Sequence, residues 1–135
     1  MARARFRVGH PGAVNAYTPP GWPVEVPPPG APGWERRAAA WLLDLCPHEY
    51  RGYSLLGRHP LLLVRLTARL VAAQQGGTDA AVGALRADLA GYLPGTVVAE
   101  GLAVLEHERQ RLAAQSHAVM LVERALRGQV FVPRL

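Results

Sequence analysis

The densest group of chemically reactive side chains is the segment DLCPHEY, residues 44–50. Cys46 and His48 could offer a thiolate and an imidazole to zinc, with Asp44 or Glu49 beside them. A closed structural zinc site needs four ligands, however, and Cys46 is the only cysteine of the chain. The alternative is a small buried Cys46 at a helix end, with His48 and Glu49 facing water. We keep Cys46 and His48 as weak metal candidates and predict neither a metal nor a cofactor.

The same thiol could serve two other kinds of chemistry. Cys46 and Pro47 form the dipeptide found in haem-responsive proteins, so a metal- or haem-linked sensor is one alternative function. A Cys–His nucleophile would need an exposed thiol with a lowered pKa. A cysteine near the C-terminus of a helix lies at the negative end of the helix dipole, which opposes thiolate formation. Since no phosphate-loop, Gly-x-Ser-x-Gly or His-Glu-x-x-His motif occurs, we predict no catalytic residue and no enzyme.

A second charged cluster, EHERQR, spans residues 106–111. On a helix, His107 and Arg111 share a face and Glu108 can reach Arg111. Such a cluster could transfer protons or fix the register of a helical interface. A solvated face with ordinary helical ion pairs is the commoner outcome. The sequence leaves all three interpretations open.

A third group consists of arginines with helical spacing. Arg58, Arg65 and Arg69 fall at i, i+7 and i+11, and would form a basic stripe that could bind nucleic-acid phosphates. An N-terminal arm could assist through three more arginines around Phe6, namely Arg3, Arg5 and Arg7. The formal net charge of +5 agrees with this, but the chain has no lysine, and this pattern indicates GC-rich codon usage. Solvated or carboxylate-paired arginines are the alternative.

The spacing of apolar residues predicts the elements that must position these groups. Four main helices are expected, at about 33–46, 60–75, 79–92 and 97–127, and together they predict an all-α bundle. The segment GGTDAAV predicts a break between the second and third helices, with Thr78 as the N-cap of the third.

The last helix carries one apolar position repeated at a strict interval of seven. A coiled coil needs a second apolar position in each repeat of seven residues. Leu102 occupies that position once, but polar residues occupy it in the repeats that follow. We expect this helix to pack in the bundle, and the repeat also allows it to pack against its own copy in a homodimer. The predicted interaction residues are Val98, Leu105, Leu112, Val119 and Leu126.

Eight of the twelve prolines lie in the first 33 residues, so this part of the chain cannot be regular helix. We divide the single domain into a basic arm (1–20), a proline-rich strap (21–33), the helical bundle (34–128) and an extended tail (129–135), which could pair with residues 5–8. The strap is expected to dock on the protein's own surface with Trp22 as its anchor. A flexible linker, or a P-x-x-P ligand for a partner, is the alternative.

Composition points to a globular protein, with 50% hydrophobic and 19% charged residues. A single cysteine, no signal-like segment and no membrane-length apolar run predict a cytoplasmic location without membrane contact. The segments GWPVEVPPPGAPGWERRAAAWLLDLCPHEYRGY, RHPLLLVRL and LVERALRGQVFVPRL resemble small uncharacterised proteins of high-GC Gram-positive bacteria. This resemblance implies a cytoplasmic bacterial setting and no mechanism.

We therefore predict a small helical interaction or regulatory protein that acts through protein surfaces, with a protein partner or a second copy. Nucleic-acid binding through the arginine arm and stripe is the first alternative. A sensor at Cys46 and His48 is the second.

Overall fold

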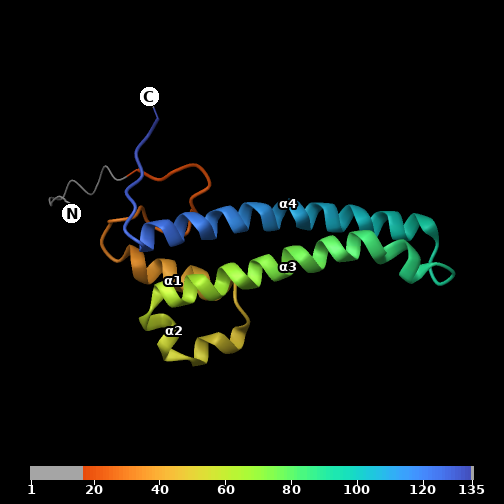
Figure 1. Ribbon diagram of the computed structural model, residues 1–135, viewed down its shortest axis with the longest axis horizontal. Helices are drawn as coiled ribbons and strands as arrows, with labels where there is room; N and C mark the ends of the chain where they lie inside the picture. The colour runs from red at the N-terminus through yellow and green to blue at the C-terminus, as the bar shows by residue number, and fades with distance from the viewer. Residues whose placement is uncertain (1–16, 135) are drawn as a thin grey trace.

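Two long antiparallel helices form the frame of the molecule in the computed structural model, which describes residues 17–134 (Figure 1). They are α3 (Pro60–Leu89) and α4 (Gly95–Leu126), joined by the loop 90–94. The shorter elements are α1 (Trp34–Asp44), the 3-10 helix η2 (His48–Gly52) and α2 (Ser54–Arg58). No strand occurs in residues 17–134, and the predicted all-α class is confirmed. Four α-helices are present, but α2 was not expected, and α3 takes the place of two predicted helices.

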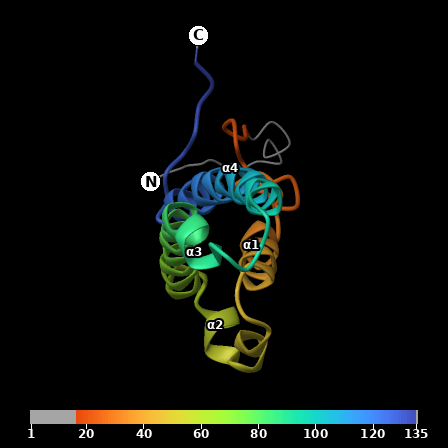
Figure 2. The ribbon, with the colours of Figure 1, turned by 90° about the vertical axis from the view of Figure 1, so that its right-hand side faces the viewer.

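Helix α1 packs against both long helices, but only near one end of the hairpin. Viewed from the loop end, α1 lies beside α3 and beneath α4, so three helices meet there (Figure 2). We call this part, α3 60–71 with α4 112–126, the proximal half. The remainder, α3 72–89 with α4 95–111, projects as two helices alone and is called the distal half (Figure 1).

The core lies where α1 meets the proximal half. Most of the largest fully buried side chains of residues 17–134 gather there, from α1, α3 and α4: Leu42, Leu63, Val64, Thr67, Val71, Val119 and Val122. Leu112 of α4 is also fully buried but lies outside this cluster. In the distal half, across α3 72–89, the connecting loop and α4 95–111, Val98 is the only buried residue. The hydrophobic core therefore stabilises one end of the hairpin much more than the other.

The predicted break between residues 75 and 79 is wrong, because α3 runs through it without interruption. Gly76 and Gly77 adopt no positive φ, and Thr78 lies inside the helix where we had expected a cap. Two glycines cost a helix only about 1 kcal/mol each. Neighbouring α4 offsets this cost, and Asp79 pairs with Arg109 across the two helices at 3.0 Å. Tertiary packing has overridden local propensity.

The proline-rich strap lies on the protein's own surface. Trp22 is only 8% exposed and Val26 is also buried, whereas Val24 between them is 94% exposed. Gly21 has a φ of 93°, and an added Cβ there would lie 2.4 Å from Cδ2 of His117. A glycine is required at this point because the backbone both turns left-handed and passes directly over α4.

The tail from 129 to 134 has no regular secondary structure. Its suggested partner, residues 5–8, lies outside the described residues, as does most of the predicted basic arm. Phe131 of the tail packs against the Trp22 ring at a centroid distance of 6.2 Å. None of the helices in residues 17–134 combines the length and the apolar character needed to cross a membrane.

Candidate functional site

The structure separates the two residues of the candidate metal site. Cys46 is buried against α3, with Sγ 3.2 Å from Oγ1 of Thr67, while His48 is exposed. The Thr67 hydroxyl donates its single hydrogen to the Leu63 carbonyl at 2.8 Å, so the Cys46 thiol must be the donor to Thr67. Asp44 pairs instead with Arg51. Among residues 17–134, no group of three or more Cys, His, Asp or Glu side chains is arranged to hold a metal.

The EHERQR cluster is divided between two roles. Arg109 reaches across to Asp79 of α3 and also contacts Glu106 at 3.3 Å. Glu108 and Arg111 form a separate pair with an N–O distance of 2.7 Å. The hydrogen bond from Arg111 lowers the pKa of the Glu108 carboxyl. Arg109 thus ties α3 to α4, whereas Glu108 and Arg111 remain at the surface as a compact pair of opposite charges.

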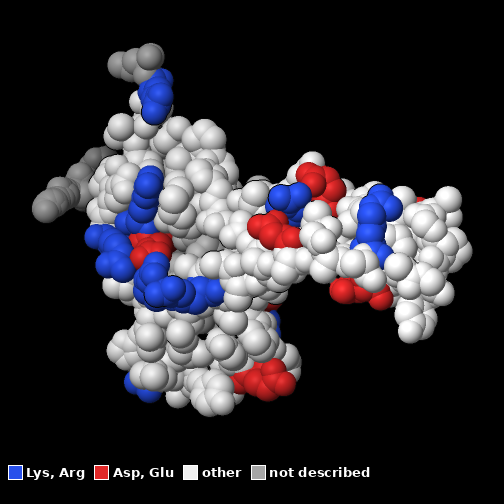
Figure 3. Space-filling view, turned by 45° about the vertical axis from the view of Figure 1, so that its right-hand side comes forward, with Lys and Arg blue, Asp and Glu red and all other residues white. Residues whose placement is uncertain are grey.

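The predicted basic stripe does not lie on one helix. Arg58 ends α2, and His59, with a φ of −130°, separates it from Arg65 and Arg69 on α3. The i, i+7, i+11 spacing assumed a continuous helix, which the junction before Pro60 interrupts. Arg65 donates to Glu123 of α4 at 2.9 Å. Figure 3 shows arginines gathered around an acidic patch at the proximal end.

Glu123 is the carboxylate that receives Arg65. Arg127 approaches it at 2.9 Å as well, and the Glu123 side chain is only 15% exposed. Burial alone would raise the pKa of Glu123, but the hydrogen bonds from Arg65 and Arg127 outweigh it and hold that pKa below its usual value. The charge of Arg65 is therefore committed to an ion pair within the protein.

The apolar residues that recur at intervals of seven along α4, which we call the seam, face the protein's own interior. Val98, Leu112 and Val119 are buried, and Leu105 and Leu126 are half-buried. A second copy could reach the three buried residues only if the monomer opened. In the folded monomer, the seam as a whole is therefore not available for an intermolecular contact.

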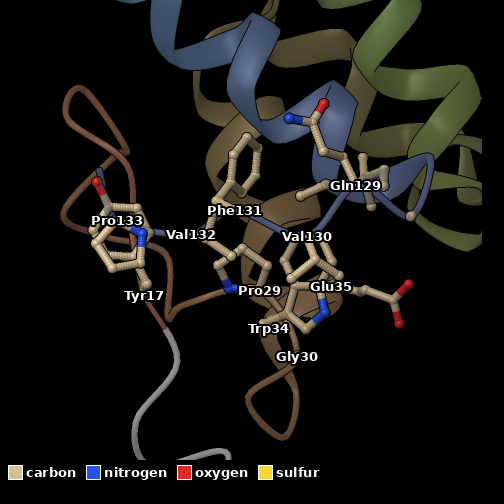
Figure 4. Close-up of a pocket in the computed structure, with 13 residues that line it drawn as sticks. Tyr17, Pro29, Gly30, Trp34, Glu35, Gln129, Val130, Phe131, Val132 and Pro133 are labelled. Atoms are coloured by element: carbon tan, nitrogen blue, oxygen red, sulfur yellow. The ribbon is translucent and has the colours of Figure 1, made fainter. Parts of the chain in front are cut away.

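Two hollows border the C-terminal tail, with volumes of about 610 and 750 Å³. Tyr17 and tail residues 129–133 line both of them, and Trp34 and Pro29 belong to the first (Figure 4). The carboxylate of Glu35 points away from the other labelled side chains in Figure 4. The walls are mainly prolines, aromatic rings and irregular backbone, so the hollows show no arrangement typical of catalysis. The sequence did not predict them because their walls have no periodic pattern.

A third hollow, which we call the distal groove, lies between the two long helices beyond α1. Its volume is about 330 Å³. Eight residues line it: Gln74, Gly77, Thr78 and Ala81 from α3, and Leu105, Glu108, Arg111 and Leu112 from α4. Along α3, steps of three and four residues lead from Val71 in the core to Gln74, Thr78 and Ala81. The groove is thus the continuation of the face that packs in the core with α1.

The apolar residues beside the distal groove were missed in the sequence. Val97 and Val104 precede Arg111 by fourteen and seven residues, so all three share one stripe of α4. Val104 is 61% exposed and Val97 is exposed as well. A second seven-residue series, displaced by one position from the seam at Val98, was the signal that could have identified them.

Comparison of the chain with protein-family models, with curated proteins and with solved structures finds no match. The function is therefore argued from the surfaces of the molecule itself.

Proposed function

We propose that this chain is a non-enzymatic interaction protein of the cytoplasm that acts through a protein surface on the distal half of the hairpin. The single observation that carries the proposal is the uneven core. Three helices bury the proximal half, whereas Val98 alone is buried in the distal half. A pair of helices without a third layer leaves part of each apolar face exposed to water.

The exposed residues of the distal half suit a binding surface. Val97 and Val104 lie on one stripe, and Tyr92 and Leu93 are exposed at the loop end. Covering apolar surface of this kind contributes about 25 cal/mol per Å². A groove between two helices, with small residues in its floor, is a shape that accepts an amphipathic helix.

Photo-crosslinking tests this proposal in the native host. A photoreactive phenylalanine analogue is placed at Val104, beside the distal groove, and in a matched control at Ala113, which is exposed and about 180° further around α4. We expect covalent protein adducts from position 104 that are absent from position 113. Absence of any protein adduct at position 104 would contradict the proposal.

Nucleic-acid binding is a second candidate function, favoured by the arginines at the proximal end (Figure 3). Arg58 and Arg69 are exposed and form no ion pair with residues 17–134. Their charges would serve phosphate binding, whereas Arg65 is already neutralised. Fluorescence anisotropy with labelled duplex and single strands tests it. Binding should weaken steeply between about 50 and 200 mM salt, and no signal at low salt rejects it.

A further inference from the structure

We propose that the occupant of the distal groove is the distal half of a second copy of this chain, so that two hairpins form a four-helix bundle about a twofold axis. This inference rests on the proposed function and names its partner. It differs from a dimer centred on the Val98 seam, because it uses the neighbouring face of α4 with Val97, Val104 and Arg111. Of the seam, it includes only Leu105 and Leu112, which line the groove.

The proximal half shows what kind of element this face accepts. There the same face of α3 packs with α1, an eleven-residue helix that also contacts α4. Helix α1 ends before the distal groove begins, and no other helix of residues 17–134 packs against both long helices. The distal groove is thus the continuation of an existing helix–helix interface, which favours a helix as its occupant.

The two sides of the distal groove are complementary to each other in shape. Next to the groove, on the stripe of α4 that leads to Arg111, stand two protruding valines, of which Val104 is 61% exposed. The α3 side carries Gly77 and Ala81, and the space next to Gly77 is open to a distance of 4 Å. A twofold axis would set the valines of each copy against the small residues of the other, as an isologous interface requires.

The charges in the distal groove are also self-complementary. Glu108 and Arg111 are the only charged residues that line it, so their charges cancel. A twofold axis between them can place each Glu108 near the Arg111 of the other copy. A partner of strongly acidic or basic character would gain nothing from such a neutral groove.

The available area is sufficient for a modest dimer. Eighteen residues of α3, 72–89, extend about 27 Å, and two packed helices present a face about 20 Å wide. The projected area is then about 540 Å² per copy, and the accessible area is larger. The two copies together would contribute about 1,080 Å², slightly more than the roughly 1,000 Å² in total that a specific interface needs, and this size is typical of weak complexes. We expect a dissociation constant in the micromolar range.

Sedimentation velocity of the purified full chain at about 1 to 200 μM tests the inference. We expect a monomer–dimer equilibrium that Val104→Arg weakens at least tenfold. Ala113→Arg adds the same charge on the opposite face of α4 and should leave the equilibrium unchanged. A monomer throughout this range overturns the inference. A dimer that persists in both Val104→Arg and the second groove variant, Val97→Arg, also overturns it.

Both groove variants change exposed side chains, so circular dichroism melting at low concentration should show that each still folds. The crosslinking experiment then separates this inference from the proposed function. An adduct of twice the chain mass from position 104 supports a second copy. An adduct with a different protein, together with a monomeric purified chain, overturns the inference and leaves the proposed function standing. No adduct rejects both.

Discussion

The buried ring of Trp22 holds an otherwise irregular segment to the helical core. It packs against Trp34 at a centroid distance of 6.1 Å and against Phe131 of the tail. Its Nε1–H donates to the carbonyl of Val26 at 2.9 Å, so the polar edge of the indole is satisfied although it is buried. One side chain thus connects the strap, the start of α1 and the tail.

Replacing Trp22 with alanine should lower the free energy of unfolding by about 3–5 kcal/mol, because a large cavity would remain among Trp34, Phe131 and Val26. Urea unfolding followed by circular dichroism measures the change. Val24→Ala in the same strap is the control, and its effect should stay within about 0.5 kcal/mol because that side chain is 94% exposed. Equal stability of the two variants would show that the strap is only a linker.

Glu123 is the charged residue with the clearest consequence for pH. Its pKa is lowered in the folded protein, so the carboxylate contributes stability above its unfolded pKa of about 4.3. That contribution is lost as pH falls through the lower, folded pKa. The arginine partners are half-exposed, which limits the contribution to about 1 kcal/mol.

We expect Glu123→Gln to be less stable than the wild type at pH 7 and to approach it as the pH falls through the lowered, folded pKa of Glu123, below which both side chains are neutral. Urea unfolding at a series of pH values gives the two curves. Glu106→Gln, whose partner Arg109 lies on the same helix, should cause a smaller loss at pH 7. Parallel curves for the wild type and Glu123→Gln would contradict the assignment.

At the scale of the element, α3 demonstrates that two adjacent glycines do not by themselves end a helix. Gly76 is exposed and has open space around the position of a Cβ. Gly91, in the loop after α3, instead has a φ of 84° and needs the left-handed conformation. Glycine therefore weakens the interior of α3 at position 76 and allows the left-handed turn of the loop that follows α3 at position 91.

Gly76→Ala should therefore raise the free energy of unfolding by about 0.5–1 kcal/mol, since alanine is the better helix former and meets no obstacle. Gly91→Ala should lower it by about 1 kcal/mol because of the positive φ. Thermal and urea melts of both variants provide the measurement. Destabilisation by Gly76→Ala would indicate that the helix is interrupted at this point.

At the scale of the whole molecule, the hairpin and its core differ in length. Helix α1 has 11 residues and spans about 16 Å, whereas α3 has 30 residues and spans about 45 Å. A single short helix cannot cover both halves of the hairpin. The distal half of the monomer therefore depends on one helix–helix contact and on the Arg109–Asp79 ion pair.

Hydrogen exchange should reveal this difference along the chain. At about 1 μM we expect amides of the distal half, in α3 72–89 and α4 95–111, to exchange at least tenfold faster than those near Val64 and Val122. At about 200 μM the distal amides should become protected as the second copy binds. Mass spectrometry of peptides gives both measurements. Uniform exchange along α3 at low concentration would contradict the uneven core.

The sequence by itself determined where most helices begin and end. Pro60 lies in the first turn of α3, and Gly128, with a φ of 97°, follows α4. The apolar period also identified the α4 positions that face inward, Val98, Leu112 and Val119. These features follow from residues close together in the chain, because proline, glycine and helical spacing act locally.

Only the tertiary structure decided that α3 continues through Gly76 and Gly77 and that the distal groove stays open. It also placed Arg58 on α2, apart from Arg65 and Arg69 on α3. These outcomes depend on how segments that are distant in the sequence pack together. The neighbouring series of α4 that starts at Val97 is buried at Ala118 and Ala125 but exposed at Val97 and Val104. Its spacing is the same throughout, so periodicity could not determine which part of it would stay uncovered. The crossing of the helices and the short length of α1 settled it, because burial depends on contacts between residues far apart in the sequence.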